Sequence, residues 1–225
     1  MRSSTLQSTA KMYKKIDIEN WDRKAQYYFF KDYDNPFFNL CTEVDVTNLL
    51  KYSRENGLSF FITSMFASQK AVNGTENFRL RIKDGSVILY DKVDGGSTVL
   101  NPDNTFSFCY FEYHETFDLF GSGMNAALQK LRKDGNIFDP HDDKDDLIHY
   151  SVIPWIAFSG LGHPRKFKTN DSIPKIVFGK YHKKHDKMVM PLSIDVHHSL
   201  MDAWHISQYL QLFQEILNGP ELHYS

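Results

Sequence analysis

The 225-residue sequence contains only two cysteines, Cys41 and Cys109, and has no apolar run of membrane-spanning length. Two isolated cysteines form neither a disulfide framework nor a metal-ligand motif, which fits a reducing compartment. A bilayer-crossing helix needs about 20 consecutive apolar residues, so the sequence predicts no membrane anchor. We therefore expect a cytoplasmic protein.

Neither positive nor negative charge is in large excess. Lys and Arg number 26 against 28 Asp and Glu, which gives a formal net charge of −2. A protein that binds nucleic acid or an anionic membrane usually carries a strong basic bias. The composition therefore favours neither a nucleic-acid partner nor a membrane partner.

The chain shows no internal repeat and no low-complexity linker, so we expect one domain over residues 12–225. A hydrophobic content of 41% and an aromatic content of 15% suffice for a substantial core. Residues 1–11 are polar and lack the apolar segment of a secretory signal, which predicts a disordered leader or a cloning remnant.

Hydrophobic periodicity predicts a mixture of helices and strands. A short-loop hairpin is expected around Asp84 and Gly85. We expect helices near residues 20–29, 58–73 and 115–132 and from 202 onward, and strands near 37–44, 78–82, 87–90, 97–100, 106–111, 148–158, 175–180 and 188–197. The acidic stretch 134–146 is expected to be a solvated connection. This order of elements predicts an α+β domain with a mixed sheet.

His198 is the most informative single residue. It follows a run in which Met190 to Val196 alternate with period 2, and it continues the apolar face of that run. A histidine carried inward by a strand is partly desolvated, so its neutral ring can accept a proton near neutral pH, as a general base must. The alternative is a hydrogen-bonded core histidine with no chemical role.

The segment after His198 changes to a helical period from about Asp202, and Asn218-Gly219-Pro220 ends it. Asp202 therefore lies at a junction between a strand and a helix. Its carboxylate can cap the helix or pair with an arginine from elsewhere in the chain.

These residues resemble the signature of the chloramphenicol acetyltransferase family, which is a histidine pair, three residues and then Asp-Gly. Further segments resemble the family's other motifs and follow in its order. They are Asp17 to Arg23, Phe78-Arg79, Lys83 to Gly85, Thr105 to Ser107, Ser151 to Trp155 and Phe178 to Tyr181. The resemblance implies a two-layer α+β sandwich, a mixed sheet packed by helices, of the coenzyme A-dependent acyltransferase type.

The resemblance also implies an activity, the O-acetylation of chloramphenicol or a related small acceptor, which underlies antibiotic resistance. His198 would remove the hydroxyl proton as the oxygen attacks acetyl-CoA directly, without an acyl-enzyme and without a metal. Ser151 would donate a hydrogen bond to the oxyanion of the tetrahedral intermediate. An ordinary strand serine is the alternative for Ser151.

Other residues take supporting roles in the family pattern. Arg23 and Asp202 would form a buried structural ion pair, and loss of one partner of such a pair costs roughly 3–5 kcal/mol. Trp155, Lys180 and Tyr181 resemble positions near the coenzyme, although Lys180 also fits a solvated surface lysine. The family assembles as a homotrimer with active sites at subunit boundaries, so aromatic side chains left exposed on one chain would be useful.

The acceptor pocket diverges from the family pattern. The residues expected to line it are Phe29, Phe30, Phe38, Phe106, Phe108, His149, Leu161 and His163. Phe108 stands where a smaller residue is usual, while His149 and residues 160–165 stand where apolar and amide side chains are usual. Added volume and charge disfavour an unchanged ligand, so we expect chloramphenicol to be a poor acceptor.

Two departures concern the rate of the reaction. Ala203 replaces the motif glycine, which would strain the turn if that glycine were needed for its conformation. Val177 replaces a threonine whose hydroxyl could order a water near the intermediate. These replacements, with Phe108, also allow a protein that binds a flat aromatic ligand without turnover.

A metal-dependent hydrolase is the remaining alternative. His198, Asp202 and His205 offer ligands at spacings of four and three residues, and His182 with His185 offers a second cluster. A change from strand to helix between His198 and Asp202 weakens the first set, and flanking lysines weaken the second. We therefore expect no metal site.

Overall fold

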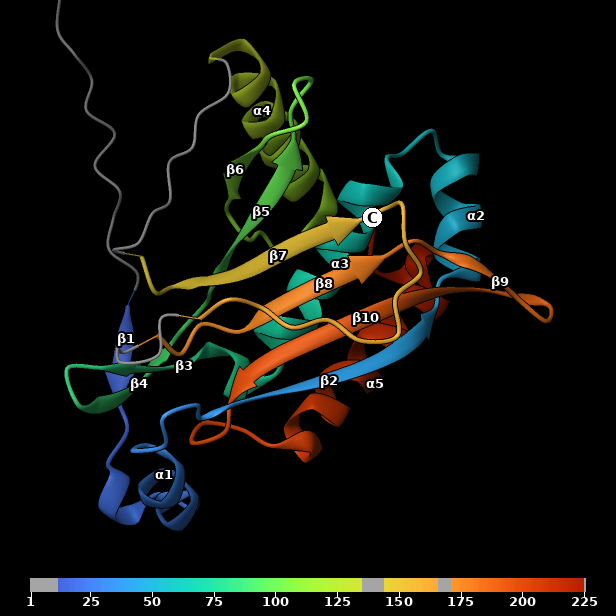
Figure 1. Cartoon of the computed structure of the whole chain (residues 1–225). Helices are drawn as coiled ribbons and strands as arrows, with labels where there is room; N and C mark the ends of the chain where they lie inside the picture. The colour runs from blue at the N-terminus through green and yellow to red at the C-terminus, as the bar shows by residue number, and fades with distance from the viewer. Residues whose placement is uncertain (1–11, 135–143, 166–170, 225) are drawn as a thin grey trace, which may run out of the picture.

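A computed structural model describes residues 12–134, 144–165 and 171–224 of the chain. The expected leader over residues 1–11 and most of the acidic stretch lie outside these residues. A large mixed sheet, helices on one of its faces and a small second sheet make up the described structure (Figure 1).

The large sheet has the strand order β2-β10-β8-β7-β5-β6, with β9 paired to β10. Its strands are β2 (Phe37–Asp45), β5 (Asp94–Leu100), β6 (Phe106–Phe111), β7 (Leu147–Ile153), β8 (Lys175–Gly179), β9 (His182–Lys184) and β10 (Lys187–His197). The pairs β5–β7 and β7–β8 are parallel, whereas β10 is antiparallel to β2, β8 and β9, and β5 to β6. The sheet is therefore mixed, as the sequence predicts.

The second sheet has the order β1-β4-β3 and lies beside the start of β5 (Figure 1). Its strands are β1 (Tyr13–Lys15), β3 (Leu80–Lys83) and β4 (Ser86–Tyr90). Asp84 and Gly85 join β3 to β4, and both have positive φ, of 49° and 71°. Two central residues in this conformation are typical of a tight hairpin turn, so the hairpin prediction is confirmed.

The helices are α1 (Lys24–Phe30), α2 (Thr47–Glu55), α3 (Phe60–Gly74), α4 (Phe117–Asp134) and α5 (Ala203–Asn218). Helices α3 and α5 pack together behind the large sheet (Figure 1). The apolar stripe of α5, including Ile206 and Phe213, meets Leu192 and Ile194 of β10 in one buried cluster. Over the described part of the chain, no helix combines the length and apolarity that crossing a membrane requires.

The opposite face of the large sheet, which we call the open face, is covered by no helix formed from the described residues. A connection from Pro154 to Arg165 runs across it in front of β8 and β10 (Figure 1). The Lys180 amide donates to the Ile156 carbonyl at 2.9 Å, and the Phe158 ring packs on Gly179, where an added Cβ would come within 2.9 Å of it. Only glycine allows this close approach.

Most expected elements are present, with shifted ends. The strand expected over residues 148–158 ends at Ile153, because Pro154 cannot donate a ladder hydrogen bond. Helix α1 begins at Lys24 rather than near residue 20, and residues 18–20 form a 3₁₀ turn. Strands β1 and β9 were not expected, because three residues are too few to show a period. Helix α2 was also not expected, although its buried side carries Leu49 and Leu50.

Candidate active site

His198 lies in the turn that follows β10, beyond the last strand residue. Its amide donates to the Pro36 carbonyl at 2.8 Å, which anchors the turn to the start of β2. Its ring stacks on Phe30 of α1, with centroids 4.0 Å apart and planes 16° apart, and lies 4.6 Å from Phe38. His198 is therefore half-buried between two aromatic side chains, directly after the strand, in agreement with the partial desolvation expected of it.

The two ring nitrogens of His198 have different surroundings. Nδ1 lies 3.2 Å from the carbonyl oxygen of Met201. A carbonyl oxygen can only accept a hydrogen bond, so this contact favours the tautomer with the proton on Nδ1. Nε2 then carries the lone pair and is the atom able to accept a proton from a substrate.

His197 is the more deeply buried member of the pair, with 5% of its surface exposed. It packs edge-on against Phe37 at 5.0 Å, and its Nδ1 accepts from the Ser199 amide at 3.3 Å. Burial lowers the pKa of His197 to about 4. Of the two histidines, the one that lies within β10 is therefore the more deeply buried.

Arg23 and Asp202 form the expected ion pair, with Nη1 and Oδ2 2.7 Å apart. Arg23 Nη2 also donates to the His198 carbonyl at 3.2 Å, which ties the pair to the turn. The Arg23 residue is 8% exposed, but the Asp202 side chain is 35% exposed, so in a single chain the pair is half-buried rather than buried.

Asp202 is also the N-cap of α5. Its Oδ1 accepts from the Trp204 amide at 3.0 Å and lies 3.0 Å from Nδ1 of His205. Burial raises the pKa of the Asp202 carboxyl, but the hydrogen bond from Arg23 and the nearby His205 outweigh it and hold the pKa below its ordinary value. The carboxylate is therefore charged at neutral pH and links the cap, the arginine and the turn.

Ala203 is the first residue of α5 and is exposed. The non-glycine residues with positive φ over the described ranges are Asp84, Asn104 and His185, so Ala203 is in none of these strained conformations. Alanine is also a favourable residue in the first turn of a helix. The backbone at this position therefore does not require glycine.

Ser151 lies on the open face, in β7. It is directly opposite Val177 of β8 in the parallel register, and its Oγ accepts from Thr98 Oγ1 at 3.3 Å. A hydroxyl that accepts from one neighbour still has its own O–H to donate. Ser151 is half-buried and can therefore donate into the space above the sheet.

Ser151 and His198 of one chain are far apart. The register aligns Ser151 with Val177 and Val177 with Ser193, and His198 follows five residues after Ser193. Two strand spacings and five residue rises place their Cα atoms roughly 15–20 Å apart. Figure 1 agrees, since β10 ends beside α1 while β7 runs toward the opposite side of the sheet. A single chain does not bring the two groups to one substrate.

The expected acceptor-pocket residues fall into two groups for the same reason. Phe29, Phe30 and Phe38 lie near the His198 turn, where Phe29 and Phe30 contact each other edge-on at 4.8 Å. Phe106, Phe108, His149, Leu161 and His163 belong to the open face and the connection across it. Phe108 is opposite Thr98, the residue that contacts Ser151.

A set of charged residues on the open face was not identified from the sequence as one cluster. Arg165 ion-pairs with Asp195 of β10 and with Asp171, and its guanidinium lies 3.8 Å from the Phe37 ring centre. His149, next to Lys175 across the sheet, has its pKa lowered to about 4 by burial and by the Lys175 ammonium. The sequence did contain one indication of this cluster. Lys175 in β8 and Asp195 in β10 alternate with the core residues of their strands, which places both side chains on the open face.

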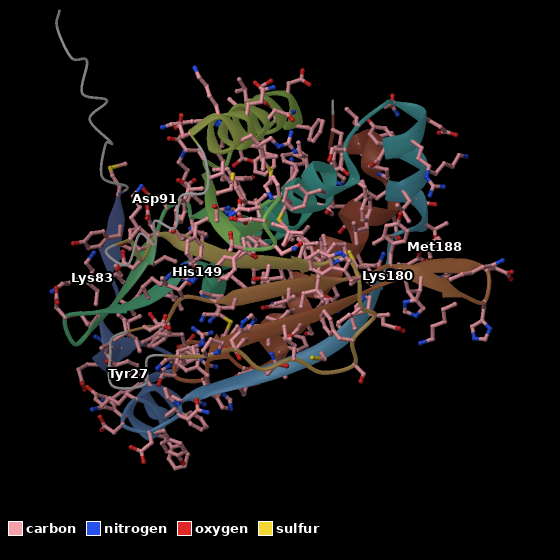
Figure 2. All side chains as sticks on the ribbon, turned by 45° about the horizontal axis from the view of Figure 1, so that its top comes forward. Tyr27, Lys83, Asp91, His149, Lys180 and Met188 are labelled. Atoms are coloured by element: carbon pink, nitrogen blue, oxygen red, sulfur yellow. The ribbon has the colours of Figure 1, made fainter. Side chains whose placement is uncertain are left out.

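Two of the three expected coenzyme residues line one cavity. Lys180 and Tyr181 border an apolar space of about 320 Å³ with Phe60, Phe61 and Met190, at the ends of β7 and β8. Trp155 is 60% exposed and does not line this cavity. Figure 2 shows Lys180 toward the β9 side of the molecule and His149 toward the β3–β4 hairpin.

The alternative metal clusters are occupied by other contacts. His205 Nδ1 faces Asp202, and His198 Nδ1 faces Met201. His182 Nε2 lies 3.4 Å from Glu43, and His185 occupies a left-handed turn residue with φ of 54°. Across the three described ranges, no three His, Cys, Asp or Glu side chains gather in a metal-binding arrangement.

Sequence comparisons identify the family of the chain. The family model described as chloramphenicol acetyltransferase matches residues 11–214. Chloramphenicol acetyltransferase 3 of Escherichia coli is 27% identical over 208 residues, covering 92% of this chain and 98% of the relative. The chloramphenicol acetyltransferase of Proteus mirabilis is 28% identical over 201 residues, which cover 89% of this chain and 92% of the relative.

Solved structures give the same grouping. A chloramphenicol acetyltransferase structure superposes with a TM-score of 0.85 at 29% identity, covering 92% of this chain and all of the other. A probable dihydrolipoamide acetyltransferase from Listeria monocytogenes superposes with a TM-score of 0.63 at 12% identity. The match covers 87% of this chain and 89% of the other and shows a shared fold. The chain is an acyltransferase and belongs to the chloramphenicol acetyltransferase family.

Proposed function

We propose that the protein transfers the acetyl group of acetyl-CoA to a hydroxyl of a small acceptor related to chloramphenicol, with His198 as the general base. The observation that carries this proposal is the His198 turn. Its Nδ1 faces a carbonyl oxygen, its ring is clamped by Phe30, and its backbone is tied to Arg23. A base must be held in one orientation and one tautomer to work, and these contacts supply both.

The reaction then proceeds without a covalent enzyme intermediate. His198 Nε2 takes the acceptor's hydroxyl proton as that oxygen attacks the thioester carbonyl carbon. Ser151 donates its O–H to the oxyanion that forms, an interaction stronger in the transition state than in the ground state. The intermediate expels the coenzyme thiolate, which receives the proton back from His198. The products are the acetyl ester and free coenzyme A.

This mechanism needs two copies of the chain at each site, because Ser151 and His198 are roughly 15–20 Å apart within one copy. We propose a homotrimer in which His198 of one copy faces the open face of the next. Phe29 and Phe106 support this arrangement, since their side chains are 62% and 46% exposed in a single chain. Aromatic surface of this kind is typical of an interface.

The coenzyme is expected at the ends of β7 and β8. The cavity beside Lys180 and Tyr181 is lined mainly by apolar side chains, which suits the pantetheine arm, and the Lys180 ammonium suits a phosphate. Exposed Trp155 offers a flat surface for adenine. No metal takes part in this scheme. Acetyl-CoA is consumed as a co-substrate, so the proposal places the protein in the cytoplasm, where it would modify an antibiotic-like compound.

Mixing two inactive variants tests both the residues and the shared site. His198→Ala and Ser151→Ala are each expected to lose most activity alone, as measured by acceptor-dependent thiol release. If the two residues of a site come from different copies, randomly mixed oligomers regain about one quarter of the wild-type sites. Unmixed samples of each variant at the same total concentration are the control. No recovery after confirmed subunit exchange would place both residues of a site in one chain.

A further inference from the structure

Lys175 occupies a central place on the open face. It is the first residue of β8, and the register puts it between His149 of β7 and Asp195 of β10. The side chain is half-buried under the connection that crosses the face, and its Nζ donates to the Pro164 carbonyl at 2.9 Å. Burial and repulsion from Arg165 both lower the pKa of the Lys175 ammonium.

The carboxylates near Lys175 are engaged by another residue. Arg165 makes charged hydrogen bonds to Asp195 and Asp171, and it also donates to the Ile173 carbonyl at 2.9 Å. Among the ion pairs formed within the described ranges, none involves Lys175. An ammonium has three donors, so Lys175 has hydrogen-bonding capacity beyond its bond to Pro164.

Two neutral imidazoles flank this ammonium. Burial, and then the Lys175 charge, lower the pKa of His149 to about 4 and also lower the pKa of His163. His163 Nε2 is buried and has no hydrogen-bond partner within the described structure. An apolar ligand ring placed here would leave the remaining Lys175 donors and His163 Nε2 unpaired, which is costly, whereas a charged oxygen would satisfy them.

The spacing to the reacting centre is short. Lys175 is two residues before Val177, which is opposite Ser151, so the Cα atoms of Lys175 and Ser151 are about 8 Å apart. In the proposed mechanism the reacting hydroxyl lies next to the thioester carbonyl whose oxygen Ser151 binds. An acceptor with a charge one aromatic ring away from that hydroxyl would span the distance to Lys175.

We propose that the acceptor of this enzyme is an alcohol that carries an anionic group, a carboxylate or a phosphate, held by Lys175 with His149 and His163 beside it. The inference rests on the proposed function for the position of the reacting hydroxyl. It assigns Lys175 to substrate selection rather than to the chemical step. A neutral acceptor such as chloramphenicol has no negative charge to pair with this ammonium.

Three matched alcohols test the proposal: para-(hydroxymethyl)benzoate, para-(hydroxymethyl)phenyl phosphate and neutral para-(hydroxymethyl)benzamide. Both kcat/KM for thiol release and the dissociation constant without acetyl-CoA are measured for each. A charge-assisted hydrogen bond predicts that at least one anionic compound is favoured over the amide by about 10- to 100-fold. Whichever anion gains more identifies the carboxylate or the phosphate as the preferred group.

Lys175→Met is expected to reduce that preference to about one, while Lys175→Arg retains most of it. Lys130→Met, on the exposed side of α4, is the matched control and should retain the full preference. If Lys175→Met does not fold, Lys175→Gln gives the same test with a polar side chain. Equal binding of the three compounds to the wild type, or a preference that survives loss of the ammonium, overturns the proposal.

The two hypotheses fail separately. If none of the three is acetylated but another alcohol gives His198-dependent thiol release, the acetyltransferase assignment stands, and the binding constants decide the role of Lys175. If no alcohol gives His198-dependent release, the proposed function falls, and the ratio of dissociation constants still shows whether the open face selects an anion.

Discussion

The His198 turn and the open face around Ser151 are built by different kinds of interaction. Residues close in sequence make much of the turn, because Met201, Asp202 and His205 fix it through hydrogen bonds across at most three residues. The open face combines side chains from β7, β8 and β10 with Arg165 from a long connection. The turn holds the proposed base, while the face holds the charged residues Arg165, Lys175 and Asp195.

This difference indicates which part of the molecule positions the proposed base and which part selects the acceptor. A capped helix start and a tight turn are fixed by contacts within a few residues, so the proposed base is positioned independently of the residues on the open face. A connection that crosses a sheet can exchange apolar residues for Arg165 and His163 without altering the strands beneath it. Family membership therefore defines the reaction more firmly than it defines the acceptor.

The largest expected effect concerns the turn. His198→Ala should lower kcat/KM for acetyl transfer by about 10²–10⁴-fold, because a positioned base contributes that much. Circular dichroism and the oligomeric state should be unchanged, since the substitution removes no charged partner. His197→Ala, at the neighbouring buried position, should hurt turnover less and stability more. Equal rates for wild type and His198→Ala on a confirmed acceptor would exclude His198 as the base.

The next effect concerns the open face. Ser151→Ala should lower kcat by about 10²–10³-fold with little change in the affinity for acetyl-CoA, because the hydroxyl is assigned to the oxyanion. Steady-state kinetics with direct measurement of acetyl-CoA binding separates the two quantities. Thr98→Val, which removes the hydroxyl that contacts Ser151, is the comparison variant and should have a smaller effect. A change confined to KM would place Ser151 in ground-state binding instead.

A third prediction uses the buried imidazole beside the turn. The pKa of His197 is about 4 in the folded protein, below the ordinary value of about 6.5, so the unfolded chain binds the proton more readily. The free energy of unfolding is therefore highest above about pH 6.5. It falls by as much as about 3 kcal/mol as the pH decreases toward 4, because the unfolded chain takes up the proton first.

Urea unfolding at several pH values measures this effect. His197→Phe should show a shallower loss of unfolding free energy between about pH 6.5 and 4, while above about pH 7 the two proteins should differ by a constant amount. His149→Phe, which removes the other imidazole with a pKa of about 4, provides a second case. Parallel curves for wild type and His197→Phe down to pH 4 would contradict the assignment.

Much of the fold is predictable from the sequence because its elements have clear periods. The stripe of α5 and the alternation in β10 locate the helical face and the central strand, and β6 occupies the expected residues. Helix α2 is amphipathic, with Leu49 and Leu50 buried, but it is only nine residues long and polar on average. A helix this short depends on packing against α3 and α5, which its sequence alone does not reveal.

The site is predictable in part for a similar reason. The ion pair between Arg23 and Asp202 joins residues far apart in the chain, and only the family pattern links them. The separation of Ser151 from His198 follows from strand register, which sequence periodicity alone leaves open. The charged cluster around Lys175 depends on where the connection with Arg165 crosses the sheet, so tertiary structure was needed to find it.

The smallest expected effect tests volume against charge on the open face. Phe108 is opposite Thr98 and stacks with Tyr110 at 6.3 Å, so its ring occupies space near Ser151. If this ring overlaps the position of chloramphenicol, Phe108→Ser should raise kcat/KM for chloramphenicol by about tenfold, within the 1–3 kcal/mol typical of overpacking. Phe106→Ser, at the exposed end of the same strand, should have less effect. If Phe108→Ser gives no gain and Lys175→Met does, charge rather than volume excludes chloramphenicol, whereas efficient acetylation by the unmodified protein would refute both explanations and leave His198 as the base.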